Sequence, residues 1–241
     1  AGSHTIKGRF SNNLAGETAK IDSRRIVALW LASYTPPNLL TYNCKYIVTS
    51  TTAVTTTSTS LVDDTQAIQT FSLTASQTVL VIYQASHAQG ATMPSRGMQN
   101  AISVDGTDCA NSWDSPYNSA TNPTRNTVFW IGALTSGSHA IKGRFASGTA
   151  GTNANITNRV LLIYILNGDA FYYLDDSATQ TATSSSLQDD SASFTFTPPG
   201  TCKALILYNI ANMNLVTEDP YGKKAAINIG GTDYSQAEKS A

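Results

Sequence analysis

The sequence predicts an all-β protein built from two tandem jelly-roll-like antiparallel β-sandwiches. Three observations lead to this fold class: many short runs rich in β-branched and aromatic residues, no segment with a convincing helical period, and an internal repeat that is cut out of phase. The chain has 241 residues, which is enough for two ordinary domains, each with its own core.

Eight strand-like runs occupy one complete copy of the repeat. Several alternate between apolar and polar residues, as Phe71-Ser72-Leu73 does, which is typical of a sheet with one buried face. Eight antiparallel strands are the number in a jelly-roll sandwich; an immunoglobulin-like Greek key is the alternative, disfavoured because no Cys-Trp-Cys spacing is present. The predicted strands cover residues 45–50, 53–60, 66–74, 78–85, 100–106, 126–134, 138–146 and 156–166.

The repeat is most evident at the start of the chain. Residues 2–10 recur as residues 137–145 with eight of nine positions identical, an offset of 137 − 2 = 135. Further matches have offsets of 126 and 125, and Tyr83 aligns with Tyr208 at the shorter of these. Since the offsets differ only by short gaps, the two halves are copies of one β unit.

The phase of the repeat predicts the domains. Residues 36–168 form one complete unit, whereas residues 169–241 supply only the first five strands of the second, and residues 1–35 supply its last two. The second unit closes either in cis or by strand exchange with a neighbour. Segment 109–136, with its strand 126–134, has no counterpart, so one strand position is vacant, unless the missing strand belongs to a longer array.

The charge pattern argues against a nucleic-acid partner. The formal net charge is −1, only 13% of residues are charged, and no basic stripe is present. No apolar run approaches the roughly 18 residues that a membrane span needs. The Thr-rich, charge-poor composition favours a virion or extracellular location.

Three cysteines fit no metal-finger spacing. Cys44 and Cys109 both align with residues of the other copy that lack sulfur. Two cysteines that form a disulfide would be gained or lost together, so a bridge between these two is expected in an oxidising compartment. Cys202 would then remain free. The sequon at Asn155 allows glycosylation if the chain is exported.

Paired acids recur in both copies, and their oxygens are the ligands that Ca²⁺ prefers. The pairs are Asp63-Asp64 and Asp189-Asp190. No calcium-loop pattern surrounds them, so turn chemistry is the favoured interpretation and calcium the alternative. Lys7 and Arg9, like Lys142 and Arg144, are spaced two apart and are expected on a solvated strand face.

The repeated Ser-His pair does not predict catalysis. Neighbouring residues on a strand point to opposite faces, so Ser138 and His139 do not form a catalytic pair, and a structural role is expected for His139 and for His4. The stretch 109–125 is the longest irregular segment and is expected to be a ligand loop, with Trp113 and Tyr117 as contact residues.

One resemblance supplies a functional expectation. Residues 131–134, 137–141 and 158–162 resemble the late strands of TNF/C1q-like jelly-roll modules of phage and archaeal-virus structural proteins. The resemblance implies a non-enzymatic coat, spike or decoration subunit of a virion; an extracellular filament subunit is the related expectation. Such a subunit forms homo-oligomers or polymers through β-strand complementation.

The alternative is a carbohydrate-binding or adhesive module that recognises a host-surface glycan. No set of acid, base and nucleophile is evident, so no enzyme activity and no cofactor are expected.

Overall fold

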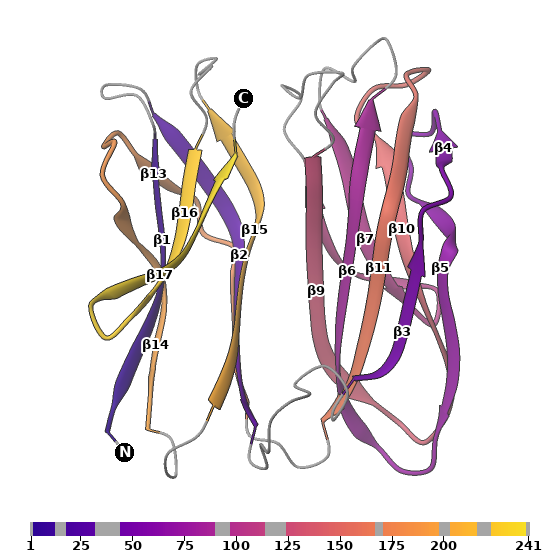
Figure 1. Cartoon of the computed structure of the whole chain (residues 1–241), viewed down its shortest axis with the longest axis horizontal. Helices are drawn as coiled ribbons and strands as arrows, with labels where there is room; N and C mark the ends of the chain where they lie inside the picture. The colour runs from indigo at the N-terminus through magenta and orange to yellow at the C-terminus, as the bar shows by residue number, and fades with distance from the viewer. Residues whose placement is uncertain are drawn as a thin grey trace. The chain divides into compact units, whose positions relative to one another are not determined.

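The computed structural model describes residues 2–12, 18–31, 44–89, 97–113, 124–166, 171–197, 203–215 and 223–239 (Figure 1). Every regular element among these residues is a β-strand, and the predicted pair of tandem jelly-roll-like sandwiches is confirmed. The chain forms two compact units: unit 1 comprises residues 1–34 and 169–241, and unit 2 comprises residues 35–168. No helix long and apolar enough to cross a bilayer occurs in the described part of the chain.

Unit 2 is a sandwich of two antiparallel sheets. One sheet has the order β3-β11-β6-β9, with the short β4 also paired to β11, and the other has the order β5-β10-β7-β8. The strands are β3 (Cys44–Ser50), β4 (Val54–Thr56), β5 (Val62–Leu73), β6 (Gln77–Gln89), β7 (Met98–Val104), β8 (Thr107–Trp113), β9 (Thr124–Leu134), β10 (Gly137–Ser147) and β11 (Ala154–Leu166).

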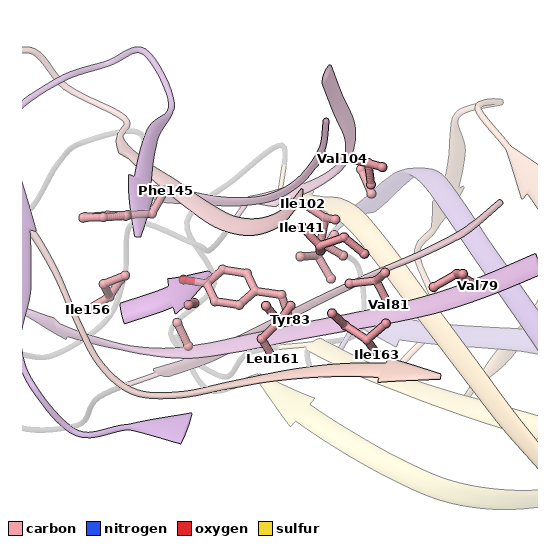
Figure 2. Close-up of a cluster of buried hydrophobic side chains, with 14 of the residues drawn as sticks. Val79, Val81, Tyr83, Ile102, Val104, Ile141, Phe145, Ile156, Leu161 and Ile163 are labelled. Carbon is pink, nitrogen blue, oxygen red and sulfur yellow. The ribbon is translucent and has the colours of Figure 1, made fainter. Parts of the chain in front are cut away.

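The core of unit 2 lies between its sheets. Alternate side chains of each strand point inward, so the apolar residues of the two sheets meet in one continuous cluster. Figure 2 shows Ile102, Ile141 and Phe145 of one sheet across from Val81 and Tyr83 of the other. All five are completely buried.

Unit 1 repeats this plan with strands from both ends of the chain. Its strands are β1 (His4–Asn12), β2 (Ala19–Leu31), β12 (Phe171–Asp176), β13 (Gln180–Ala182), β14 (Gln188–Phe196), β15 (Lys203–Leu215), β16 (Lys223–Ile229) and β17 (Thr232–Lys239). The first sheet has the order β14-β1-β16-β17, and in the second β2 pairs with β12, β13 and β15. The N-terminal strands are therefore central in both sheets.

The two units correspond strand by strand. β1 lies between β14 and β16 as β10 lies between β5 and β7, and both pairings shift register at the same place, between Lys7 and Arg9 and between Lys142 and Arg144. Likewise β2, β12 and β15 match β11, β3 and β6. The place of β9 alone has no counterpart among the described residues of unit 1.

One strand was missing from the sequence prediction. Residues 107–113 form β8, which pairs with β7 through a tight turn at Asp105-Gly106, so the expected ligand loop does not begin at Cys109. Both turn residues have positive φ, 50° and 86°, as a type I′ hairpin requires. Unit 1 has the same hairpin between β16 and β17, so the segment without a counterpart is shorter than 109–136.

Candidate functional site

A buried ion pair links the two sheets of unit 2. Nε of Arg159 on β11 is 2.7 Å from Oδ2 of Asp64 on β5, and both side chains are inaccessible to solvent. The hydroxyl of Tyr83 donates to the same carboxylate at 2.9 Å, and the amide of Gln66 donates to its other oxygen at 3.1 Å. Burial raises the pKa of Asp64 above its usual value, while these donors and Arg159 oppose that effect.

Unit 1 contains the same arrangement. Nε of Arg24 is 3.0 Å from Asp190, and the hydroxyl of Tyr208 donates to Asp190 at 2.8 Å. Here Arg24 also binds Asp176 at 2.7 Å, a position held by Ser50 in the other copy. Two carboxylates therefore share one guanidinium in unit 1. The pKa of Asp176 is lowered, chiefly by the hydrogen bond from the backbone amide of Ala178, and Ser191 and Arg24 contribute to the same shift.

The outer acid of each pair binds the cations of the neighbouring strand. Asp63 accepts from Lys142 and Arg144 at 2.5 Å and 3.0 Å, and Arg144 reaches on to Asp108 at 2.6 Å. In unit 1 Asp189 lies 2.7 Å from Lys7 and 3.0 Å from Arg9. Lys142 and Arg144 lie on the partly exposed face of β10, in agreement with the period of two in the sequence, and acids of the neighbouring strands pair with them there.

These contacts correct the interpretation of the paired acids. Asp63-Asp64 lie within β5 and Asp189-Asp190 within β14, not in turns. Each inner acid still accepts the amide two residues on, the local hydrogen bond that makes Asp frequent in turns. Their oxygens face ammonium and guanidinium groups, and no group of three metal-ligating residues occurs where the structure describes the chain.

The two repeated histidines have different surroundings. His139 is buried, with Nδ1 2.8 Å from Asp105 and Nε2 2.9 Å from the carbonyl of Thr135. The bond to Asp105 is the main cause that raises the pKa of His139. His4 is exposed and packs against Phe196, because the place of Asp105 is taken by Gly230 in unit 1. The expected shared role of the two histidines is therefore not observed.

The predicted disulfide is not formed. Cys109 is a free thiol on β8, whereas Cys44 begins β3. β3 and β8 are edge strands of different sheets. β3 lies across from β5 and β8 lies across from β9, so the two cysteine-bearing strands are at opposite ends of the sandwich. The simultaneous loss of sulfur at the equivalent positions of unit 1 was thus a misleading signal. Cys202 lies outside the described residues.

Other predicted contact residues are not brought together. Trp113 is the last residue of β8 and its side chain lies outside the description, as does all of Tyr117. Asn155 lies in β11 between β4 and β6, and its side chain is partly buried. The glycosylation sequon therefore sits within a sheet instead of an exposed loop.

A polar pocket of about 660 Å³ opens in unit 2 beside the register shift of β11. Six of its eight lining residues carry a hydroxyl or amide group, and one of them, Asn158, adopts a positive φ of 44°. The lining residues are Thr49, Ser50, Thr51, Thr52, Gln84, Asn158, Arg159 and Val160. Sequence reasoning missed this pocket because its residues come from strands that are distant in the chain.

The second candidate site is an open sheet edge in unit 1. In unit 2, β6 pairs with β11 on one side and with β9 on the other, from Gln77 to His87. Its counterpart β15 pairs with β2 from Lys203 to Leu215, and within the described residues nothing pairs with its other side. Among the described residues β15 is therefore an edge strand, and an edge strand is a template for pairing with a further strand.

Comparisons with known proteins add only distant likenesses. No family model and no curated protein matches the chain. A Stig cyclase from Fischerella sp. TAU is 13% identical over 44% of this chain and 61% of its own, with a TM-score of 0.30. A family 35 carbohydrate-binding module from Clostridium thermocellum is 18% identical over 49% of this chain and 91% of its own, with a TM-score of 0.27.

The structure of infectious bursal disease virus Gx strain matches 90% of this chain and 68% of its own at 12% identity, with a TM-score of 0.31. At these TM-scores the likenesses carry no argument about function.

Proposed function

We propose that the protein is a non-enzymatic structural subunit of a virion or an extracellular filament, which assembles with its own copies by β-strand pairing. The single observation that carries this proposal is the open edge of β15. Soluble proteins normally protect such an edge with charges, proline or a covering segment, and an unprotected edge is a template for strand addition.

The sequence of β15 supports this function. Between Ala204 and Leu215 the strand has no charged residue and no proline. Buried acids and bases elsewhere are engaged with one another in both units, which suits a scaffold better than a reaction centre.

Self-association tests the proposal directly. Light scattering after size-exclusion chromatography of the full chain is expected to show oligomers that grow with concentration. Leu207→Lys places a charge on the open edge and is expected to shift the population to monomers. Thr179→Lys adds the same charge to unit 1 between β12 and β13, on the other side of β2, and should leave association unchanged. A wild-type chain that is monomeric at every concentration would overturn the proposal.

A carbohydrate-binding module is the second candidate, and the polar pocket is the observation that favours it. Its volume and its hydroxyl and amide lining fit a small polar ligand such as a sugar. Glycan-array binding that is lost in both Gln84→Ala and Asn158→Ala would support this function, and an array without binding would remove it.

A further inference from the structure

We propose that the open edge of β15 receives an antiparallel strand with the sequence of β9, supplied by another copy of this repeat. The inference rests on the proposed function and names the strand that would complete unit 1. In unit 2 the equivalent edge shows what fills it: β9 pairs with β6 along eleven residue pairs, from Gln77–Leu134 to His87–Thr124.

The register of the incoming strand follows from the alignment of β6 with β15. Tyr83 and Tyr208 are equivalent, since each donates its hydroxyl to the buried aspartate of its own unit. The offset is 208 − 83 = 125. Because Val128 lies opposite Tyr83, the incoming Val128 would lie opposite Tyr208, and Trp130 would lie opposite Ile206.

Unit 1 is less well covered at the positions that β9 protects in unit 2. Val81 and Tyr83 of β6 are completely buried, whereas their counterparts Ile206 and Tyr208 are only partly buried. The lower burial extends to the facing sheet of unit 1. In unit 2, β9 lies across from β7 and β8 of the equivalent sheet.

There Ile102 is completely buried, but its equivalent Ile227 is not. Tyr234 on β17 is 53% exposed, while its counterpart Cys109 packs against the core. The less covered surface therefore includes residues of both sheets, so a strand added at the edge of β15 would also cover the facing sheet, as β9 does in unit 2.

β9 has the chemistry that this space requires. Val128 and Leu134 belong to the core of unit 2, and the Trp130 side chain packs against the same core. Arg125 is the only charged residue of the strand. A strand of this kind would bury apolar area on both sheets and satisfy the backbone groups of β15. The β9 of this chain already pairs with β6 of unit 2, so the donor is a further copy of the repeat in which this strand is not held by its own β6.

A cross-linking experiment tests both binding and register. In β6 and β9, Gln84 lies opposite Thr127 and their side chains are hydrogen-bonded at 2.8 Å, so Asn209 of β15 is the predicted neighbour of an incoming Thr127. A synthetic peptide with the sequence of residues 124–134 and Thr127→Cys is mixed with full-length chain in which the three native cysteines are serine and Asn209→Cys is added. The disulfide yield is measured by mass spectrometry under mild oxidation.

Two matched variants provide the controls. Leu205→Cys lies four residues away on the same face of β15, about 13 Å along the strand, which is too far for a disulfide in the predicted register. Gln84→Cys occupies the same register on the edge that β9 already covers. We expect the yield at position 209 to exceed both controls by roughly tenfold.

Equal yields at positions 205 and 209, or no product at all, would overturn the inference. The outcome is independent of the light-scattering test. Assembly of the wild-type chain without peptide capture would leave the proposed function standing and reject the β9 donor. Capture of the peptide in register by a chain that is always monomeric would support the β9 donor and reject the proposed function.

Discussion

Arg159 and Asp64 form an ion pair of 2.7 Å in which neither side chain reaches solvent, and Tyr83 completes it by donating to the same carboxylate. The pair joins β11 in one sheet to β5 in the other. The same three residue types make the same contacts in unit 1, so both units contain this cross-sheet link.

Arg159→Met is expected to destabilise unit 2 by about 3–5 kcal/mol, because it leaves the Asp64 carboxylate buried without its partner charge. Urea denaturation followed by tyrosine and tryptophan fluorescence measures the change. The double variant Arg159→Met with Asp64→Leu removes both charges and should recover part of the loss. A single variant as stable as the wild type would show that the pair contributes nothing.

Gly143→Ala is expected to cost about 1–3 kcal/mol through overpacking. A Cβ at this position would lie 2.4 Å from Cε2 of Tyr83, whose ring packs directly over the glycine. The cost should shrink in a Tyr83→Leu background, where the ring is absent. Thermal unfolding of the wild type, the two single variants and the double variant gives the coupling free energy between positions 143 and 83. A coupling free energy near zero would contradict the assigned contact.

Gly106→Ala tests backbone strain without a steric clash. Its φ is +86° and nothing lies within 4 Å of an added Cβ, so the expected loss of about 1–2 kcal/mol comes from the left-handed conformation alone. Gly231→Ala, at φ +92° in the matching hairpin of unit 1, should behave alike. Equilibrium denaturation of both variants checks this, and an unchanged midpoint for either would argue against the turn conformation.

The stability of unit 2 is expected to depend on pH through His139 and Asp105. The pKa of His139 is raised, so its contribution is complete below its ordinary pKa of about 6.5 and is lost as the pH rises through the raised value. The pKa of Asp105 is lowered, chiefly by His139, so its contribution is present above about pH 3.9 and is lost as the pH falls.

The pair therefore stabilises most between about pH 4 and 6.5. Free energies of unfolding measured across this range should show the maximum in the wild type and a flatter curve in His139→Gln. His4→Gln is the matched control, since Gly230 holds the place of Asp105 in unit 1. A folded-state His139 that titrates in an NMR experiment at or below about 6.5 would contradict the expectation.

The sequence predicted the fold class well because β-sheet periodicity is local and the repeat doubles the signal. It missed β8 even though Asp105-Gly106 is a strong hairpin signal, since the polar residues that follow look like a loop. The role of the paired acids could not be predicted, because their partners Arg159 and Lys142 lie about eighty to ninety-five residues away in the chain. The polar pocket was hidden for the same reason.

The insertion of unit 2 between the two chain segments of unit 1 has a mechanical consequence. β1 and β17 both pair antiparallel with β16, one on each side, so they run parallel to each other. A force that pulls on His4 and Lys239 therefore loads the sheet of unit 1 in shear. Unit 2 lies between residues 34 and 169 and carries none of that tension while unit 1 holds. Under stretching, unit 1 bears the force first, and unit 2 comes under tension only after the sheet of unit 1 has opened.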